Sequence, residues 1–238
     1  MKAVQIDRYA RSANASVRDV PMPETGEDEV LIKVKAAAVN PLEQLIMTGS
    51  VRLIQDYPMP LTLGNECSGV VAKVGRLVKR FKVGDAVYTR LPLRSIGALA
   101  EYVAVEQSAV ARMSAGYEFA TAAAIPLTGL TAWQGLTEIL QARPGETVFI
   151  PGGSGSFGQM AVPITRALGM NVIVSGNARA GLDDCGRRDS ISGLPQGKLL
   201  GAALQCGLCY RRAWSRRIRA GAVRVEARRA AFEPAHRA

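Results

Sequence analysis

The 238-residue sequence contains one histidine, His236, and only four cysteines. A zinc enzyme that needs two or three histidine ligands is therefore excluded, and no bound metal is expected. Four cysteines are too few for a disulfide-stapled scaffold. No apolar run reaches the roughly 20 residues of a membrane-spanning helix, which excludes a transmembrane protein. The first residues also lack the apolar stretch of a signal peptide, so we expect a cytoplasmic protein.

Positive charge is distributed unevenly along the chain. Residues 1–176 contain 17 Lys and Arg against 15 Asp and Glu, whereas residues 177–238 contain 13 against 5. The formal net charge of +10 therefore comes mostly from the second segment. This difference divides the chain into a nearly neutral body and a basic tail.

Residues 1–120 predict a β-rich domain, because short apolar runs alternate with Gly- and Pro-rich turns. The expected strands cover residues 2–6, 17–20, 30–39, 68–74, 86–88 and 99–105. Many short strands of this kind are typical of a small barrel or sandwich. Two polar segments, residues 40–49 and 64–69, adjoin these strands and are predicted as loops. Both are candidates for function, although an ordinary loop and a glycine-rich turn would have the same pattern.

Residues 121–176 predict a helix followed by a strand–turn–helix–strand unit. Residues 120–140 favour a helix, with Pro126 near its start or at a break. The later elements are a strand at 147–150, a helix at 159–168 and a strand at 171–175. This order of elements is the context in which a Gly-x-Gly-x-x-Gly sequence predicts dinucleotide binding.

That glycine sequence links the first of these strands to the helix. Gly153 would permit the tight turn, Gly155 would let a pyrophosphate approach the backbone, and Gly158 would allow close helix–strand packing. Ser154 and Phe157 belong to the same turn, and the helix N-terminus would supply N–H groups to the phosphates. The alternative is a glycine-rich turn without a ligand.

The end of the second strand predicts which dinucleotide binds. An NAD site usually has Asp or Glu at this point to hold the ribose 2′-hydroxyl. Here the candidates are Ser175, Asn177 and Arg179, none of which is acidic. All three can donate hydrogen bonds to a 2′-phosphate, so we infer NADP(H) as the cofactor.

Several motifs occur in an order that resembles a known family. They are AAAVNPLEQLIMTG (36–49), GNECSGVVAKVG (64–75), VGDAVY (83–88), GALAEYVAV (97–105), AIPLTGLTAWQGL (124–136) and GETVFIPGGSGSFGQMAV (145–162). The series is similar to the N-terminal part of the medium-chain dehydrogenase/reductases, in the zinc-free quinone oxidoreductase branch. The resemblance covers residues 1–176. It implies an α/β fold in which a GroES-like β-rich domain (1–120) precedes an incomplete Rossmann-type NADP-binding domain (121–176).

The resemblance also implies an absence of zinc. The alcohol dehydrogenase branch binds zinc through a Cys in the first loop and a His in a Gly-His-Glu motif. Here the loop begins Asn40-Pro41, and the later motif is Gly64-Asn65-Glu66. Cys67 is then interpreted as a small buried side chain rather than a ligand or a reactive thiol.

The activity that the resemblance implies is hydride transfer from NADPH to a quinone or an activated enone. Asn40 would line the acceptor pocket and Thr128 would lie near the nicotinamide, as catalytic residues. Many relatives have a pocket Tyr where this chain has Leu45, so the preferred acceptor stays open. Intact members of the family are expected to form homodimers.

Residues 177–238 fall outside the resemblance and predict an irregular, Arg-rich segment. Three interpretations remain open: a non-native tail from a shifted reading frame, a basic arm for nucleic acid or anionic surfaces, and a redox or metal site at Cys206 and Cys209. The first favours a disabled oxidoreductase fragment with weak or no activity. The second would make the chain a non-enzymatic binding protein, although nucleic acid is not the expected partner.

Overall fold

The computed structural model describes residues 1–11 and 15–175. The predictions for the basic tail, including Asn177, Arg179, Cys206 and Cys209, lie outside the described residues. Within the described part, none of the helices has the length and apolar character needed to cross a bilayer.

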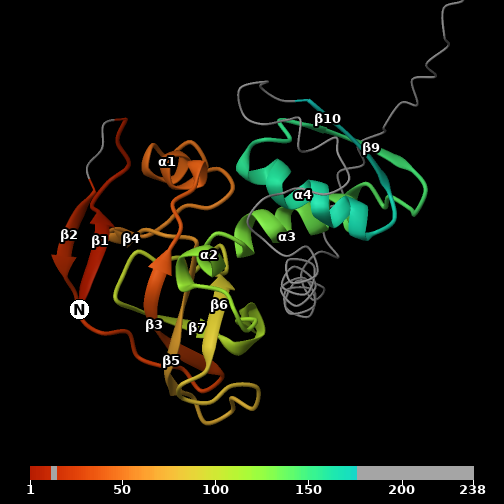
Figure 1. Ribbon diagram of the computed structural model, residues 1–238. Coiled ribbons are helices and arrows are strands. Elements are labelled where there is room, and N and C mark those ends of the chain that lie inside the picture. The colour runs from red at the N-terminus through yellow and green to blue at the C-terminus, as the bar shows by residue number, and fades with distance from the viewer. Residues whose placement is uncertain (12–14, 176–238) are drawn as a thin grey trace, which may run out of the picture.

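Two antiparallel sheets form the β-rich part of the molecule (Figure 1). The larger has the strand order β7-β3-β5-β6-β8, with bounds β3 Glu29–Ala37, β5 Glu66–Val74, β6 Ala86–Arg90, β7 Tyr102–Glu106 and β8 Val110–Arg112. The smaller has the order β2-β1-β4, with bounds β1 Lys2–Ile6, β2 Ser16–Asp19 and β4 Leu61–Thr62. A bridge between Ala3 and Ala100 connects β1 to the segment before β7. The predicted strands are therefore present, and β4 and β8 are added to them.

The core of the larger sheet is apolar and buried. Val30 and Ile32 on β3 pack with Cys67 and Val71 on β5 and Val87 on β6, and all five are at most 1% exposed. Removing apolar surface from water at about 25 cal/mol per Å² makes this cluster a main source of stability for the domain.

The segment 40–49, which the sequence predicts as a loop, contains a helix. Helix α1 spans Pro41–Met47, with Asn40 as its N-cap and Pro41 as its first residue. Seven residues are too few for a stable isolated helix, so tertiary contacts must hold it. Its Ile46 side chain is 1% exposed and packs with Ile6 and Tyr57, which supplies that support.

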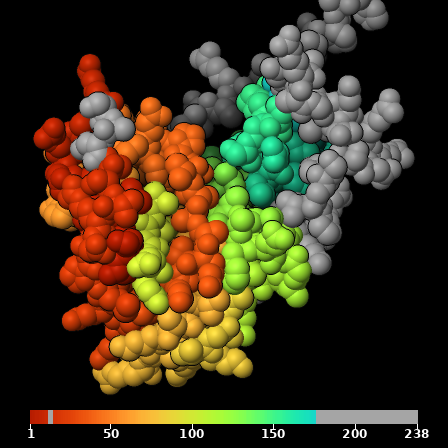
Figure 2. Space-filling view, turned by 60° about the vertical axis from the view of Figure 1, so that its left-hand side comes forward, coloured from red at the N-terminus to blue at the C-terminus, as the bar shows by residue number. Residues whose placement is uncertain are grey.

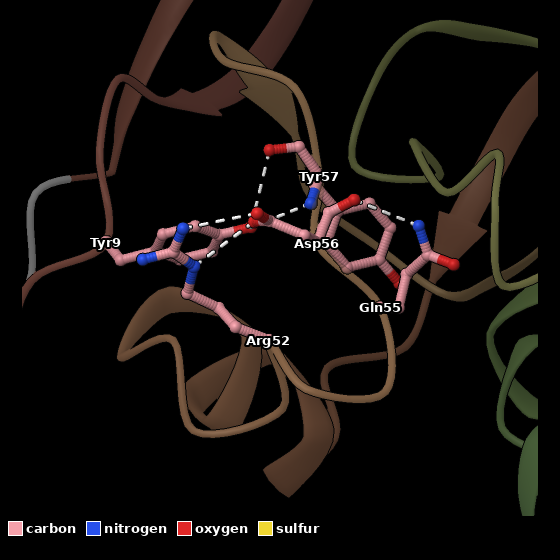
Figure 3. A network of polar contacts seen from close by, with 5 residues as sticks. All are labelled: Tyr9, Arg52, Gln55, Asp56 and Tyr57. Carbon is pink, nitrogen blue, oxygen red and sulfur yellow. Dashed lines mark hydrogen bonds and ion pairs between the residues drawn. The ribbon is translucent and has the colours of Figure 1, made fainter.

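A polar cluster fixes the chain that follows α1 (Figure 3). The Tyr57 backbone N–H donates to the Tyr9 hydroxyl oxygen at 2.8 Å, and the same hydroxyl lies 2.9 Å from an oxygen of Asp56. Arg52 binds Asp56 through two nitrogens and stacks 4.8 Å from the centre of the Tyr9 ring. These contacts tie residues 52–57 to the segment after β1.

The predicted helix at 120–140 is divided into three pieces. Helix α2 spans Phe119–Ala123, α3 spans Pro126–Gln134, and a π-helical segment, η2, spans Gly135–Ile139. Pro126 is the first residue of α3, where its missing N–H costs nothing. A 3₁₀ turn, η1 (Gln107–Ala109), precedes β8.

The strand–turn–helix–strand unit agrees with the sequence prediction. Strand β9 (Thr147–Pro151) pairs in parallel with β10 (Asn171–Ser175), and α4 (Ser156–Ala167) connects them. Helix α4 begins three residues earlier than expected, directly after the glycine-rich turn. Buried side chains of α3, η2, β9 and α4 form one cluster, so the unit is attached to the rest of the molecule through α3. Figure 2 shows this unit at one end of the molecule, beyond the residues of α2 and α3.

Candidate functional site

Two buried carboxylates lie between α1 and the start of β5. The Glu43 side chain on α1 and the Glu66 side chain at the first position of β5 are 2% and 0% exposed. Charged groups are rarely buried to this extent unless they are hydrogen-bonded. Their partners therefore define the geometry of the site.

Glu66 uses both of its oxygens. The side-chain amide of Asn40 donates to one oxygen at 2.8 Å, and the backbone N–H of Leu127 donates to the other at 2.6 Å. Asn40 precedes α1, and Leu127 is in the first turn of α3. One carboxylate thus joins the β-rich part to the helix that carries Thr128.

Glu43 binds the backbone of Asn40, whereas Glu66 binds its side chain. Its carboxylate accepts the Asn40 backbone N–H at 2.6 Å, which closes the N-terminus of α1. The same carboxylate accepts the backbone and side-chain N–H groups of Asn65 at 3.1 and 2.6 Å. The Asn65 side-chain oxygen is buried and has no hydrogen-bond partner among the described residues.

Burial dominates the electrostatics of this site. It raises the pKa of Glu66, although the hydrogen bonds from Leu127 and Asn40 act in the opposite direction. The charge of Glu43 adds to the rise and that of Arg90 reduces it. Burial also raises the pKa of the neighbouring Cys67 thiol to about 12, as expected for a packing residue and not for a nucleophile.

Thr128 lies one residue beyond Leu127 and is half-buried. Its hydroxyl donates to the Ala124 carbonyl at 3.1 Å, so the proton is used within the helix turn. The oxygen keeps its capacity to accept a hydrogen bond. Asn40 thus binds one oxygen of Glu66, and Thr128 directly follows Leu127, whose backbone binds the other oxygen.

The glycine-rich segment that runs from the end of β9 into the first turn of α4 is tightly packed at two of its glycines. A Cβ on Gly158 would lie 2.4 Å from the Gly153 carbonyl oxygen, and a Cβ on Gly153 would lie 2.9 Å from Val174 on β10. Gly155 differs, because it is exposed and an added Cβ would meet only the Gly152 oxygen, at 3.3 Å. Gly153 and Gly158 are thus required for packing, whereas the backbone at Gly155 is accessible.

One detail of the sequence prediction needs correction. The left-handed backbone of the turn is at Gly152, where φ is +72°, and not at Gly153. Gly153 is required for a different reason, because its missing side chain makes room for Val174. Gly158 likewise packs on the backbone of the turn itself.

The remaining predicted cofactor residues surround the N-terminus of α4. Phe157 is 42% exposed in its first turn, and no side chain caps the helix. Ser175 ends β10 and is exposed, and its carbonyl accepts the Gly153 N–H at 2.8 Å. Ser154 is half-buried in the turn. These residues are therefore close together, and the uncapped helix end beside open Gly155 backbone fits a dinucleotide pyrophosphate.

Sequence reasoning missed the two carboxylates. Glu43 follows Asn40 by three residues, which is the spacing of a capping box and could have predicted both the helix and this contact. Glu66 belongs to the Gly64-Asn65-Glu66 motif, but the motif alone does not reveal its role, because its partner Leu127 lies far away in the sequence.

Part of the chain matches a known domain family and several characterised proteins. Residues 26–115 match the alcohol dehydrogenase GroES-like domain family. The chain is 38% identical over 154 residues to a 2-methylene-furan-3-one reductase of Solanum lycopersicum, covering 62% of this chain and 39% of that protein. It is 36% identical over 154 residues, with the same coverage, to the NADPH-dependent alkenal/one oxidoreductase of Arabidopsis thaliana.

A solved oxidoreductase structure is also similar to this chain. The quinone oxidoreductase of Coxiella burnetii superposes with a TM-score of 0.69 at 30% identity, covering 78% of this chain and 60% of that one. The chain thus spans 39% of the length of the two curated relatives and 60% of the length of the solved structure. Residues 26–115 thus form an alcohol dehydrogenase GroES-like domain, and the proteins to which the described body is similar are quinone and alkenal oxidoreductases of the medium-chain dehydrogenase/reductase superfamily.

Proposed function

We propose that this protein is an NADPH-dependent oxidoreductase that reduces a quinone or an activated enone without zinc. The observation that carries the proposal is the open backbone at Gly155 beside the uncapped N-terminus of α4. Two relatives support the chemistry, since one is described as an NADPH-dependent alkenal/one oxidoreductase and another as a quinone oxidoreductase.

The turn and α4 would hold the cofactor. The first N–H groups of a helix have no intrahelical acceptor, so those after Gly155 are available to the pyrophosphate. At the adenosine end, Ser175 has a side-chain hydroxyl and no carboxylate that would repel a 2′-phosphate. Asn177 and Arg179 are further candidates on the basis of the sequence.

Asn40 and Thr128 would hold the reacting groups. When bound, NADPH supplies the hydride, and a quinone or enone accepts it without a metal because its own oxygen takes up the charge. The Asn40 amide uses one N–H on Glu66 and has a second for that oxygen. The Thr128 oxygen can accept an N–H from the nicotinamide carboxamide.

The test is NADPH binding by the full chain and by Gly155→Asp. An aspartate at this N-cap position favours the helix, yet its charge opposes a phosphate. We expect the variant to keep its thermal stability and to bind NADPH roughly 100-fold more weakly, because like charges in contact cost several kcal/mol.

The matched control is Gly135→Asp, where an added Cβ meets no atom within 4 Å. This variant should bind NADPH as the wild type does. Equal affinities of Gly155→Asp and wild type would contradict the proposed cofactor site. Tighter binding of NADH than of NADPH would contradict the proposed preference for NADP(H).

A further inference from the structure

A single carboxylate connects the two residues to which the proposed function assigns catalysis. Glu66 is fully buried, and each of its oxygens accepts one hydrogen bond. One donor is the side chain of Asn40 and the other is the backbone of Leu127, next to Thr128. The two donors belong to the N-termini of α1 and α3, which are distant in sequence.

The bond to α3 is made at a special place in that helix. Pro126 is its first residue and has no N–H, so Leu127 carries the first free N–H of the helix. No side chain of its own N-cap residue, Ile125, caps α3. Glu66 therefore supplies the acceptor and the negative charge that a helix N-terminus favours.

Only a carboxylate can make both contacts at once. A carboxylate accepts on two oxygens, whereas a glutamine in the same place has one oxygen and one N–H₂ group. A glutamine oxygen would accept from only one of the two donors, and if that donor is Leu127, the Asn40 amide must turn over and accept from the glutamine N–H₂ group instead of donating. Accepting both hydrogen bonds therefore requires two acceptor oxygens, which glutamine lacks although it has the same size as glutamate.

From this geometry we infer that Glu66 is a positioning residue for hydride transfer. It holds the Asn40 amide and the Thr128-bearing turn of α3 at a fixed separation, so that acceptor and nicotinamide meet in one orientation. The inference rests on the proposed function for the roles of Asn40 and Thr128. Glu66 itself is 0% exposed, so it would touch neither a bound NADPH nor the acceptor.

Glu43 provides a matched control. It is also a buried carboxylate and also binds Asn40, but its contacts are to the Asn40 backbone and to Asn65. Neither of these contacts reaches α3. A substitution at Glu43 should therefore disturb Asn40 and leave Leu127 unaffected.

The experiment compares the wild-type full chain with Glu66→Gln, Glu66→Leu and Glu43→Gln. The nuclear magnetic resonance signals of the Leu127 backbone N–H and the Asn40 side-chain amide report the two contacts. We expect Glu66→Gln to shift both signals and Glu43→Gln to shift only that of Asn40. With NADPH and an enone, Glu66→Gln should lower kcat roughly 10- to 100-fold, as small misplacements do, with KM for NADPH nearly unchanged.

The outcomes separate this inference from the proposed function. If Glu66→Gln leaves both signals and kcat at wild-type values, Glu66 is not a positioning residue. A rise of KM for NADPH without a change in kcat would also overturn it. A wild-type chain that transfers no hydride would contradict the proposed function, and the two signals would still decide whether Glu66 holds Asn40 and α3 together. If Glu66→Leu does not fold, the Glu66→Gln variant alone tests whether Glu66 is a positioning residue.

Discussion

The β-rich part and the β9–α4–β10 unit bury their strands in different ways. In the β-rich part, apolar side chains such as Ile32 are fully enclosed, and charged side chains such as Glu66 are enclosed with them. In the β9–α4–β10 unit, Val148 and Val174 face α4, whereas Phe149 and Ile173 are 60% and 56% exposed. The same residue type should therefore contribute very differently to stability in the two regions.

Alanine substitution of one isoleucine in each region tests this difference most directly. Ile32→Ala removes a side chain that is 0% exposed and should lower the free energy of unfolding by about 2–5 kcal/mol through lost burial and a new cavity. Ile173→Ala should change it by less than about 1 kcal/mol, because most of that side chain already contacts water. Urea unfolding of both variants measures this, and equal losses would show that the second region buries its open face in solution.

The reactivity of the Cys67 thiol tests whether water reaches the core of the β-rich part. Its raised pKa of about 12 makes the thiolate fraction at neutral pH on the order of a thousandfold smaller than for an ordinary thiol with a pKa of about 8.5. Native Cys67 should therefore resist iodoacetamide at neutral pH and react once the chain is unfolded in urea. Peptide mass spectrometry resolves this residue, and rapid native labelling would mean that water reaches the core.

The pH dependence of stability tests the burial of Glu66. Its folded-state pKa lies above the value of 4.5 for an exposed carboxyl, so the folded state keeps this proton longer than the unfolded state does. The contribution of Glu66 is therefore fully favourable below pH 4.5 and is lost as the pH rises through its folded pKa. The difference in unfolding free energy between wild type and Glu66→Gln should shift in favour of the variant over that interval.

A difference that is independent of pH would mean that Glu66 ionises as an exposed group does. The control is Glu24→Gln, since Glu24 is exposed in the loop before β3 and is not a hydrogen-bond partner of Glu66. The acid side of the stability curve should be nearly identical for that variant and the wild type.

The smallest expected effect concerns the cluster around Tyr9. Tyr9→Phe removes the acceptor of the Tyr57 backbone N–H and a partner of Asp56, which should cost about 1 kcal/mol of stability. Arg52 keeps its ion pair with Asp56, which limits the loss. Thermal unfolding measures the change, and a loss several times larger would mean that residues 52–57 help to support the core.

The two regions also differed in how well the sequence predicted them. Strands β9 and β10 were placed within a residue, because an apolar run between turn residues is typical of parallel strands. The sequence analysis predicts a loop where α1 lies, because a seven-residue helix depends mainly on tertiary support such as the burial of Ile46, and its one local signal is the Asn40–Glu43 spacing. The glycine turn was predicted from spacing, but the site around Glu66 required knowledge of which distant segments meet.

The most direct test of the account is the fate of a labelled hydride. The full chain is incubated with NADPH carrying deuterium on the transferred position of its nicotinamide, together with an α,β-unsaturated ketone in ordinary water. The account predicts deuterium on the β-carbon of the saturated product and a proton from water on the α-carbon. A product without deuterium, or no product under conditions where NADPH binds, would contradict it.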